Sequence, residues 1–395
     1  MSVSLPAAPL FRRGMSASPT LVTRFLALAG LAAALLAAPA HAAPFAYVAL
    51  SGTNKVAFMD MATGNVVNEI VVGSAPYGIA VSQSGRYAYV TNIVSNDISV
   101  IDTQTNTVVD SIIHSAASSQ LRNIAVHPNG TRLYTTDFLG GEGTLSVFDA
   151  ATKLSLARIP LFHAQNIAVD RSGTFAYASQ GDPTRSGPGT LAMIDLSNNS
   201  IVATIPVNVG GNIEFSPNGL TAYAVTMTGI AVIDTIGRKQ TALWRDTEHN
   251  TWTPTALTLS SDGSRLYTIS GRDKTMSTFD TSTGEALSRI TFGSEPSGLA
   301  VANQRAIVAS KVDSIVSTVD LLTNQVVKVT PVGQGPLING SVVLASQPVA
   351  ESSSGGGGGG CGFISGSGGR PDPTLPGLVI LAIMMIAMRG RRTLR

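Results

Sequence analysis

Residues 79–113 read IAVSQSGRYAYVTNIVSNDISVIDTQTNTVVDSII, and they predict four short β-strands joined by tight connections. Gly85 stands four residues before Tyr89 and indicates a turn, because Gly adopts the positive φ that other residues resist. A polar turn at Thr103–Thr107 follows the third strand, and the β-branched run 108–113 forms the fourth. The unit therefore reads strand, turn, strand, loop, strand, turn, strand.

The end of the third strand recurs along the chain, each time as a short β-rich run that ends in Asp. The seven copies end at Asp60, Asp102, Asp149, Asp195, Asp234, Asp280 and Asp320. Their spacings are 42, 47, 46, 39, 46 and 40 residues. Roughly 40–45 residues is the length of one four-stranded propeller blade. The repeats therefore predict an all-β, seven-bladed β-propeller over residues 43–350.

A second pattern supports the same repeat. A Gly four residues before a Tyr occurs at Gly85/Tyr89, Gly130/Tyr134, Gly173/Tyr177, Gly219/Tyr223 and Gly263/Tyr267. Each pair is typical of a hairpin that joins the first two strands of a unit. The body shows no sustained helical periodicity, so we expect strands throughout.

The two ends of the repeat region carry complementary pieces. Phe45–Leu50 matches the second strand of a unit, and residues 340–345 form a β segment left over after the seventh unit. We expect this segment to pair with the N-terminal strand and close the ring, because closure removes free sheet edges. An open array of repeats is the alternative.

Residues 1–42 predict an export signal. Three arginines lie before an apolar run over residues 25–37. After this run, Ala40 and Ala42 are the small residues that a signal peptidase requires at its cleavage site. We expect general secretory export with cleavage after Ala42. An uncleaved anchor is the alternative, although the apolar run is short for a bilayer.

The charge of the body differs from that of the whole chain. Residues 43–351 hold 18 Lys and Arg against 23 Asp and Glu, a net charge of −5, although the whole chain carries +2. This mildly acidic body indicates no nucleic-acid partner. The single cysteine, Cys361, lies outside the body, so no intramolecular disulfide can form.

The repeats resemble a known family. Tyr89-Val90-Thr91-Asn92 spells the signature of YVTN-family propeller repeats, and degenerate copies begin at Tyr134, Tyr177 and Tyr223. The resemblance covers nearly all of residues 43–350 and implies the propeller fold. Similar proteins include surface-layer and envelope proteins, lactonase-like propellers, and propeller domains of some haem and copper reductases. The resemblance therefore implies no single activity.

The composition changes after the body. Residues 351–374 form a Ser- and Gly-rich linker with Cys361, which we expect to be flexible. Residues 375–395 predict a hydrophobic helix and a basic tail. The apolar run 377–388 would span about 18 Å as a helix, whereas a hydrocarbon core measures about 30 Å.

This tail resembles bacterial CTERM sorting signals, and its Asp372-Pro373-Thr374-Leu375-Pro376 motif resembles the cysteine-bearing JDVT-CTERM type. The resemblance implies an intramembrane sorting protease as a partner. It also implies a processing or anchoring role for Cys361, Asp372 and Pro373, with the basic end on the cytoplasmic side. A short anchor with an incidental Cys is the alternative.

Motifs for common chemistry do not occur in the sequence. The chain has no Cys-x-x-Cys-His haem motif, no phosphate-binding Gly-x-x-x-x-Gly-Lys motif and no Gly-x-Ser-x-Gly elbow. Its four mature histidines are too few for the copper clusters of the reductase propellers. We therefore predict no cofactor and no catalytic residue, and leave a metal open.

Polar residues are expected to gather at one mouth of the central channel. Three histidines fall in loops after a fourth strand, and three asparagines stand directly before a first strand: His114, His163 and His249; Asn123, Asn166 and Asn212. These loops lie on the rim opposite the polar turns. The six residues are the candidate site for an ion, a water cluster or a small polar ligand. Alternatively, the asparagines satisfy loop backbone groups, and a metal on the histidines would need a further ligand.

Trp244 and Trp252 flank the charged loop that holds His249. Exposed aromatic residues beside charges can mark a partner site. Packing of a long loop explains the same pattern, and the sequence does not decide between the two.

These features predict an exported protein of a bacterial envelope, in the periplasm or at the cell surface, associated with the membrane through its C-terminus. We expect a binding or scaffold module for a protein, a glycan or a small ligand. The alternative is a propeller enzyme or redox accessory protein, lactonase-like or metal-assisted, with a site at the channel mouth. Expected partners of the tails are the export machinery and the sorting protease.

The tail hypothesis makes the first prediction. Replacing Cys361 with Ser is expected to change the retention and processing of the chain, because the CTERM resemblance makes this residue an attachment or processing point. Fractionation of cells that express the wild type and Cys361→Ser, followed by immunoblotting, measures both. Identical retention and size of the two proteins would remove the essential role of the cysteine.

Overall fold

The computed structural model describes residues 44–114, 120–139, 142–180, 189–246, 252–338 and 343–344. The predicted signal peptide with Ala42, His249, the linker with Cys361, and the tail with Asp372 and Pro373 lie outside these residues. The described part forms seven antiparallel sheets and no helix, so the all-β, seven-bladed propeller is confirmed. No helix suited to crossing a membrane was found there.

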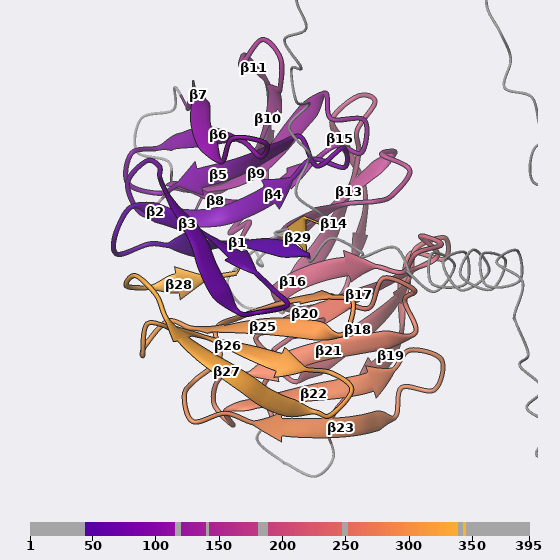
Figure 1. The fold of residues 1–395 in the computed structure, drawn as a ribbon. Coiled ribbons are helices and arrows are strands. Elements are labelled where there is room, and N and C mark those ends of the chain that lie inside the picture. The colour runs from indigo at the N-terminus through magenta and orange to yellow at the C-terminus, as the bar shows by residue number, and fades with distance from the viewer. Residues whose placement is uncertain are drawn as a thin grey trace, which may run out of the picture. The chain divides into compact units, whose positions relative to one another are not determined.

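Each sheet forms one blade (Figure 1). In six blades the strands follow in chain order from the first to the fourth, whereas in blade 1 the closing strands β28 and β29 precede β1, β2 and β3. Blades 1 to 4 are built from β1 (Phe45–Leu50), β2 (Lys55–Asp60) and β3 (Asn65–Val71); β4 (Pro76–Val81), β5 (Tyr87–Asn92), β6 (Asp97–Asp102) and β7 (Thr107–Ile113); β8 (Gln120–Val126), β9 (Arg132–Leu139), β10 (Glu142–Asp149) and β11 (Ser155–Pro160); β12 (Ile167–Val169), β13 (Phe175–Gln180), β14 (Thr190–Asp195) and β15 (Ser200–Ile205).

The remaining strands complete the ring. Blades 5 to 7 and the closing strands are β16 (Val209–Phe215), β17 (Thr221–Thr226), β18 (Gly229–Asp234) and β19 (Lys239–Trp244); β20 (Ala256–Leu259), β21 (Arg265–Ser270), β22 (Thr275–Asp280) and β23 (Ala286–Thr291); β24 (Gly298–Ala302), β25 (Arg305–Ser310), β26 (Ile315–Asp320) and β27 (Gln325–Pro331); β28 (Pro336–Leu337) and β29 (Val343–Leu344).

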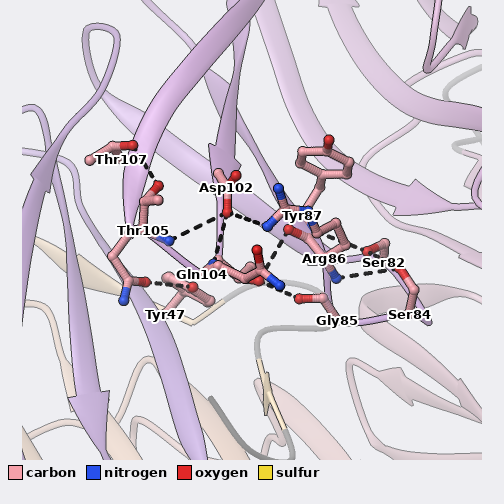
Figure 2. A network of polar contacts seen from close by, with 12 residues as sticks. Tyr47, Ser82, Ser84, Gly85, Arg86, Tyr87, Asp102, Gln104, Thr105 and Thr107 are labelled. Atoms are coloured by element: carbon pink, nitrogen blue, oxygen red, sulfur yellow. Dashed lines mark hydrogen bonds and ion pairs between the residues drawn. The ribbon is translucent and has the colours of Figure 1, made fainter. Parts of the chain in front are cut away.

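The recurring Asp ends the third strand of every blade and holds the turn that follows it. In each copy Oδ1 accepts the backbone N–H of the residue two positions later, as Asp102 does from Gln104 at 2.8 Å (Figure 2). The fourth residue after each Asp has positive φ: Gly64, Asn106, Lys153, Asn199, Arg238, Gly284 and Asn324. The carboxylate thus supplies acceptors to a turn that ends in the left-handed region.

Tyrosines of the second strands connect neighbouring blades. Tyr47 in blade 1 is buried, and its hydroxyl donates to Oδ1 of Asn106 in the turn of blade 2 at 2.9 Å (Figure 2). Burial raises the pKa of Tyr47, so the hydroxyl remains a donor. The ring of Tyr177 in blade 4 meets that of Phe215 in blade 5 at 5.0 Å. At Gly173/Tyr177 the Gly–Tyr pattern therefore marks both a turn and a contact between blades.

Apolar clusters fill the spaces between blades. One cluster joins Tyr89 and Val100 of blade 2 to Ile124 and Phe148 of blade 3, and all four side chains are nearly fully buried. Burying a side chain of this size stabilises the fold by about 1.5–3 kcal/mol. Because each blade uses both faces in such clusters, the sheets must follow one another in a ring.

The ring closes through the strands that follow blade 7. β28 and β29 both pair with β1, with Leu337 opposite Ala49 and Leu344 opposite Phe45 (Figure 1). The predicted closing segment 340–345 is thus only part of the closure, because pairing with β1 already begins at Pro336. Thr330 of blade 7 also donates to the carbonyl of Gly64 in blade 1 at 2.7 Å.

The turn carboxylate makes the second prediction. Asp102→Ala removes the acceptor of the Gln104 N–H and the partner of the Arg86 guanidinium, 2.8 Å away. We expect the free energy of unfolding to fall by about 1–3 kcal/mol, measured by equilibrium urea unfolding. Asp102→Asn keeps an oxygen that can accept the Gln104 N–H, so its free energy of unfolding is expected to fall by less. The matched control is Asp110→Ala in the exposed β7; an equal loss in this control contradicts the turn argument.

Candidate functional site

A channel runs where the first strands of the blades meet. Its cavity has a volume of about 670 Å³ and is lined by residues of β4, β8, β12, β16, β20 and β24, with Leu337 and Ile338 on the remaining side. Neighbouring first strands contact one another around it. We call this cavity the axial channel. Its loop-side mouth lies where the first strands begin, and its turn-side mouth lies where they end.

The loop-side mouth gathers side-chain amides from blades 3 and 4. Nδ2 of Asn123 donates to the carbonyl of Gln165 and to Oδ1 of Asn166, both at 2.8 Å. Oδ1 of Asn123 is buried and has no hydrogen-bond partner among the described residues. Asn166 is half-buried, and its Oδ1 is the acceptor in the contact with Asn123. This mouth therefore retains hydrogen-bonding capacity.

Asn212 lies at the same mouth but is fully engaged. Its Nδ2 donates to the carbonyl of Leu257 at 2.7 Å, and its Oδ1 accepts the N–H of Leu257 at 2.8 Å. The side chain thus pairs with the backbone of the next blade as another strand would. This geometry supports the alternative in which the asparagine satisfies backbone groups.

The first strands begin earlier than the sequence predicts. Asn166 does precede β12, but Asn123 and Asn212 lie inside β8 and β16. The pairing of both strands shifts register before the regular stretch, between Leu121 and Ile124 and between Val209 and Ile213. A register shift interrupts the alternation of inward and outward side chains. The Asn-Ile pattern therefore shows where regular alternation begins, and the strand itself starts several residues earlier.

His114 is buried inside blade 3. Its Nε2 lies 3.0 Å from Oδ2 of Asp137 and 3.1 Å from Oγ of Ser146. A Ser-His-Asp relay needs the carboxylate and the hydroxyl on different ring nitrogens, whereas here both contact Nε2. The cluster therefore ties His114, which directly follows β7, to β9 and β10, and His114 does not line the channel.

Equivalent contacts occur in other blades. The loop residue Gly73 donates its N–H to Oγ of Ser99 at 3.2 Å, and Oγ of Ser277 donates to Asp246 at 3.3 Å. In blades 2, 3 and 6 a serine of the third strand thus contacts a residue that follows the fourth strand of the preceding blade. This repetition assigns His114 a structural position.

His163 lies in the loop before β12 and also stands away from the channel lining. Its ring is 5.6 Å from that of Phe138 and 4.3 Å from that of Phe162. The structure therefore does not bring His114 and His163 together. Among the described residues, no group of three or more His, Cys, Asp and Glu side chains is arranged to hold a metal ion.

The structure supports the interpretation in which the two tryptophans pack inside the protein. Trp252 is buried, and its ring lies 5.8 Å from that of Phe279. Trp244 stacks on the same ring at 6.2 Å. Both tryptophans therefore belong to the apolar contact between blades 5 and 6.

Glu214 lines the channel toward its turn-side mouth, and sequence reasoning missed it. Its Oε2 accepts the N–H of Leu259 from blade 6 at 3.4 Å. Burial raises the pKa of Glu214 to about 7, against smaller opposing contributions from hydrogen bonds with Thr258 and Leu259 and from the charge of Arg171. The channel thus holds a carboxyl group that titrates near neutral pH.

Comparison of the repeats with one another would have found this residue. The middle residue of each regular first-strand stretch is Ala80, Ala125, Ala168, Glu214, Thr258 and Ala300. Five of the six residues are small and uncharged, so a carboxyl group in the same register is conspicuous. A desolvated titratable group in a cavity is a candidate functional residue.

Glu214 makes the third prediction. Between its unfolded value of 4.5 and about 7, the folded protein holds a proton that the unfolded chain releases. Stability therefore falls as pH rises through this window, by at most about 3 kcal/mol. In Glu214→Gln this part of the pH dependence should vanish. Urea unfolding from pH 4 to 8 measures it, with Glu285→Gln at an exposed turn as control. If the free energy of unfolding depends on pH in the same way in Glu214→Gln and in the wild type, the raised pKa does not belong to Glu214.

Comparisons with known proteins bear on the fold alone. No family model and no curated protein matches the chain. Among solved structures, Kuenenia stuttgartiensis hydrazine synthase aligns with a TM-score of 0.61 at 17% identity over 69% of this chain and 91% of that chain. A functionally unknown protein from Desulfotomaculum acetoxidans aligns at 0.60 and 15% identity, over 75% of this chain and 99% of that one. Dihydro-heme d1 dehydrogenase NirN in complex with DHE aligns at 0.54 and 16% identity, over 73% of this chain and 63% of that one. These likenesses support the seven-bladed β-propeller.

Proposed function

We propose that this chain is an exported, non-catalytic binding module that presents the loop-side mouth of its axial channel to a glycan or a small polar ligand. The observation that carries the proposal is the buried Oδ1 of Asn123 at that mouth, which has no hydrogen-bond partner among the described residues. A buried acceptor without a partner costs roughly 1–3 kcal/mol. A polar ligand or an ordered water that supplies a donor offsets this cost.

The chemistry of the loop-side mouth favours binding over catalysis. Its polar side chains are amides and hydroxyls: Asn123, Gln165, Asn166, Asn212, Thr255 and Ser297. Such groups donate and accept hydrogen bonds but do not exchange protons at neutral pH. They suit the hydroxyl and amide groups of a sugar.

The location of the protein in the envelope is part of the proposal. The export signal ending at Ala42 and the tail with Cys361 support export and retention at a membrane or cell surface. The resemblance to YVTN-family repeats, which occur in surface-layer and envelope proteins, supports the same location. A binding face on one rim suits a module held at a surface.

One observation favours an enzyme as the second candidate. Glu214 titrates near pH 7 inside the channel, as a general acid or base does. Hydrolysis of a simple lactone such as δ-valerolactone, lost in Glu214→Gln and kept in Glu285→Gln, would support this candidate. The turn-side mouth would then be the active site.

The binding proposal makes the fourth prediction. Glucose, N-acetylglucosamine and glucuronate serve as probes, and thermal unfolding of the purified chain is the readout. We expect a saturable rise in Tm of several degrees with at least one probe at about 100 times its Kd. Gln165→Ala and Asn166→Ala should reduce the rise, because both side chains lie at the loop-side mouth.

The matched control is Gln83→Ala, which removes an amide from the turn-side mouth of the same channel. It should leave the rise unchanged. Absence of any rise, or a rise that Gln83→Ala removes and Asn166→Ala does not, contradicts binding at the loop-side mouth.

A further inference from the structure

We propose that Arg122, Phe138 and His163 form a site for a carboxylated sugar, of the uronate class, on the loop side of blades 3 and 4. The inference rests on the proposed function and names a ligand class for it. The three side chains come from β8, from β9 and from the loop before β12. We call them the lateral site.

The guanidinium of Arg122 lies over the ring of Phe138, with Cζ 4.9 Å from the ring centroid. Its Nε is buried and has no hydrogen-bond partner among the described residues, and Arg122 forms no ion pair there. Guanidinium carries five N–H donors in a planar fork that matches a carboxylate. Nε is the Arg122 side-chain nitrogen that is buried without a partner, so a bound carboxylate would pair with the terminal NH2 groups of the fork.

The nearest strand partner does not neutralise this charge. Asp137 lies one residue from Phe138 and opposite Leu121, next to Arg122 in the sequence. Its carboxylate accepts from Thr144 at 3.0 Å and from Ser146 at 2.5 Å, and it contacts His114. Asp137 is buried with its own partners, so the guanidinium remains available to an external anion.

Aromatic rings flank the guanidinium. The ring centroid of Phe138 is 5.6 Å from that of His163. The guanidinium of Arg122 lies over the same Phe138 ring. Phe138 and His163 are both half-buried, so part of each ring is accessible. An aromatic surface of this kind packs on the apolar C–H face of a sugar ring. A guanidinium fork beside such a surface therefore fits a sugar that carries a carboxylate.

The position of the lateral site links it to the channel. Asn123 directly follows Arg122 and donates to Gln165 and Asn166 at the loop-side mouth. These amides supply donors and acceptors for sugar hydroxyls. A single guanidinium on a body of net charge −5 also suits one carboxylate better than a polyanion.

The inference makes the fifth prediction, for the purified full chain. Isothermal titration with glucuronate and with glucose compares two sugars that differ only in the carboxylate. We expect glucuronate to bind at least about tenfold more tightly than glucose, which corresponds to about 1.4 kcal/mol. Arg122→Gln should remove this preference, and Phe138→Leu should weaken the binding of both sugars.

Arg272→Gln is the matched control, because Arg272 is exposed on a turn of the same rim in blade 6. It should leave glucuronate binding unchanged. Arg122 forms no ion pair among the described residues, and its contact with the Phe138 ring contributes only modestly to stability. Arg122→Gln should therefore fold with a Tm within a few degrees of the wild type, so that a loss of binding in the folded variant reports the site itself.

The outcomes separate the inference from the proposed function. Equal binding of glucose and glucuronate that Asn166→Ala weakens overturns the lateral site and keeps the loop-side binding function. Glucuronate binding that Arg272→Gln weakens as much as Arg122→Gln also overturns the lateral site. No binding of either sugar overturns the inference, and the wider probe panel at the loop-side mouth then decides the function.

Discussion

Both faces of every blade are apolar, and neither can be left in water. Tyr89 of blade 2 packs on Ile124 of blade 3, and Tyr177 of blade 4 packs on Phe215 of blade 5, so each sheet covers its neighbour. A row of sheets packed in this way has two uncovered ends until the row closes. The pairing of β28 and β29 with β1 completes the blade in which the row begins and ends. Ring closure is therefore a consequence of face-to-face burial, and the repeated turns only shape the units that pack.

Closure also creates the axial channel. The first strand of each blade has one edge that no further strand covers, and these edges meet at the axis. Polar groups there need partners, which the molecule supplies unevenly. Asn212 bonds to the backbone of Leu257 in both directions and is satisfied by the ring itself. Among the described residues, Oδ1 of Asn123 has no hydrogen-bond partner, which separates a candidate binding group from a structural one.

The fold was predictable because its signals are local. The Asp that ends a third strand and the Gly four residues before a Tyr act within a few residues, and the structure confirms both at each predicted position. The site was less predictable because its groups meet across blades. His114 contacts Asp137 of the following blade, and the position of His114 in the sequence does not indicate this contact. The contact of Arg122 with Phe138 depends on a register shift in β8 that the alternating pattern conceals.

The two mouths of the channel differ in chemistry, and this difference constrains the function. Glu214 sits where most other blades have Ala, and its desolvation makes the folded state less stable as pH rises to 7. On the opposite rim, the guanidinium of Arg122 lies over the ring of Phe138, and its Nε has no hydrogen-bond partner among the described residues. Neither group contributes to the face-to-face packing that closes the ring. The ring satisfies part of the hydrogen-bonding capacity of Glu214 through the N–H of Leu259, whereas Nε of Arg122 has no hydrogen-bond partner among the described residues.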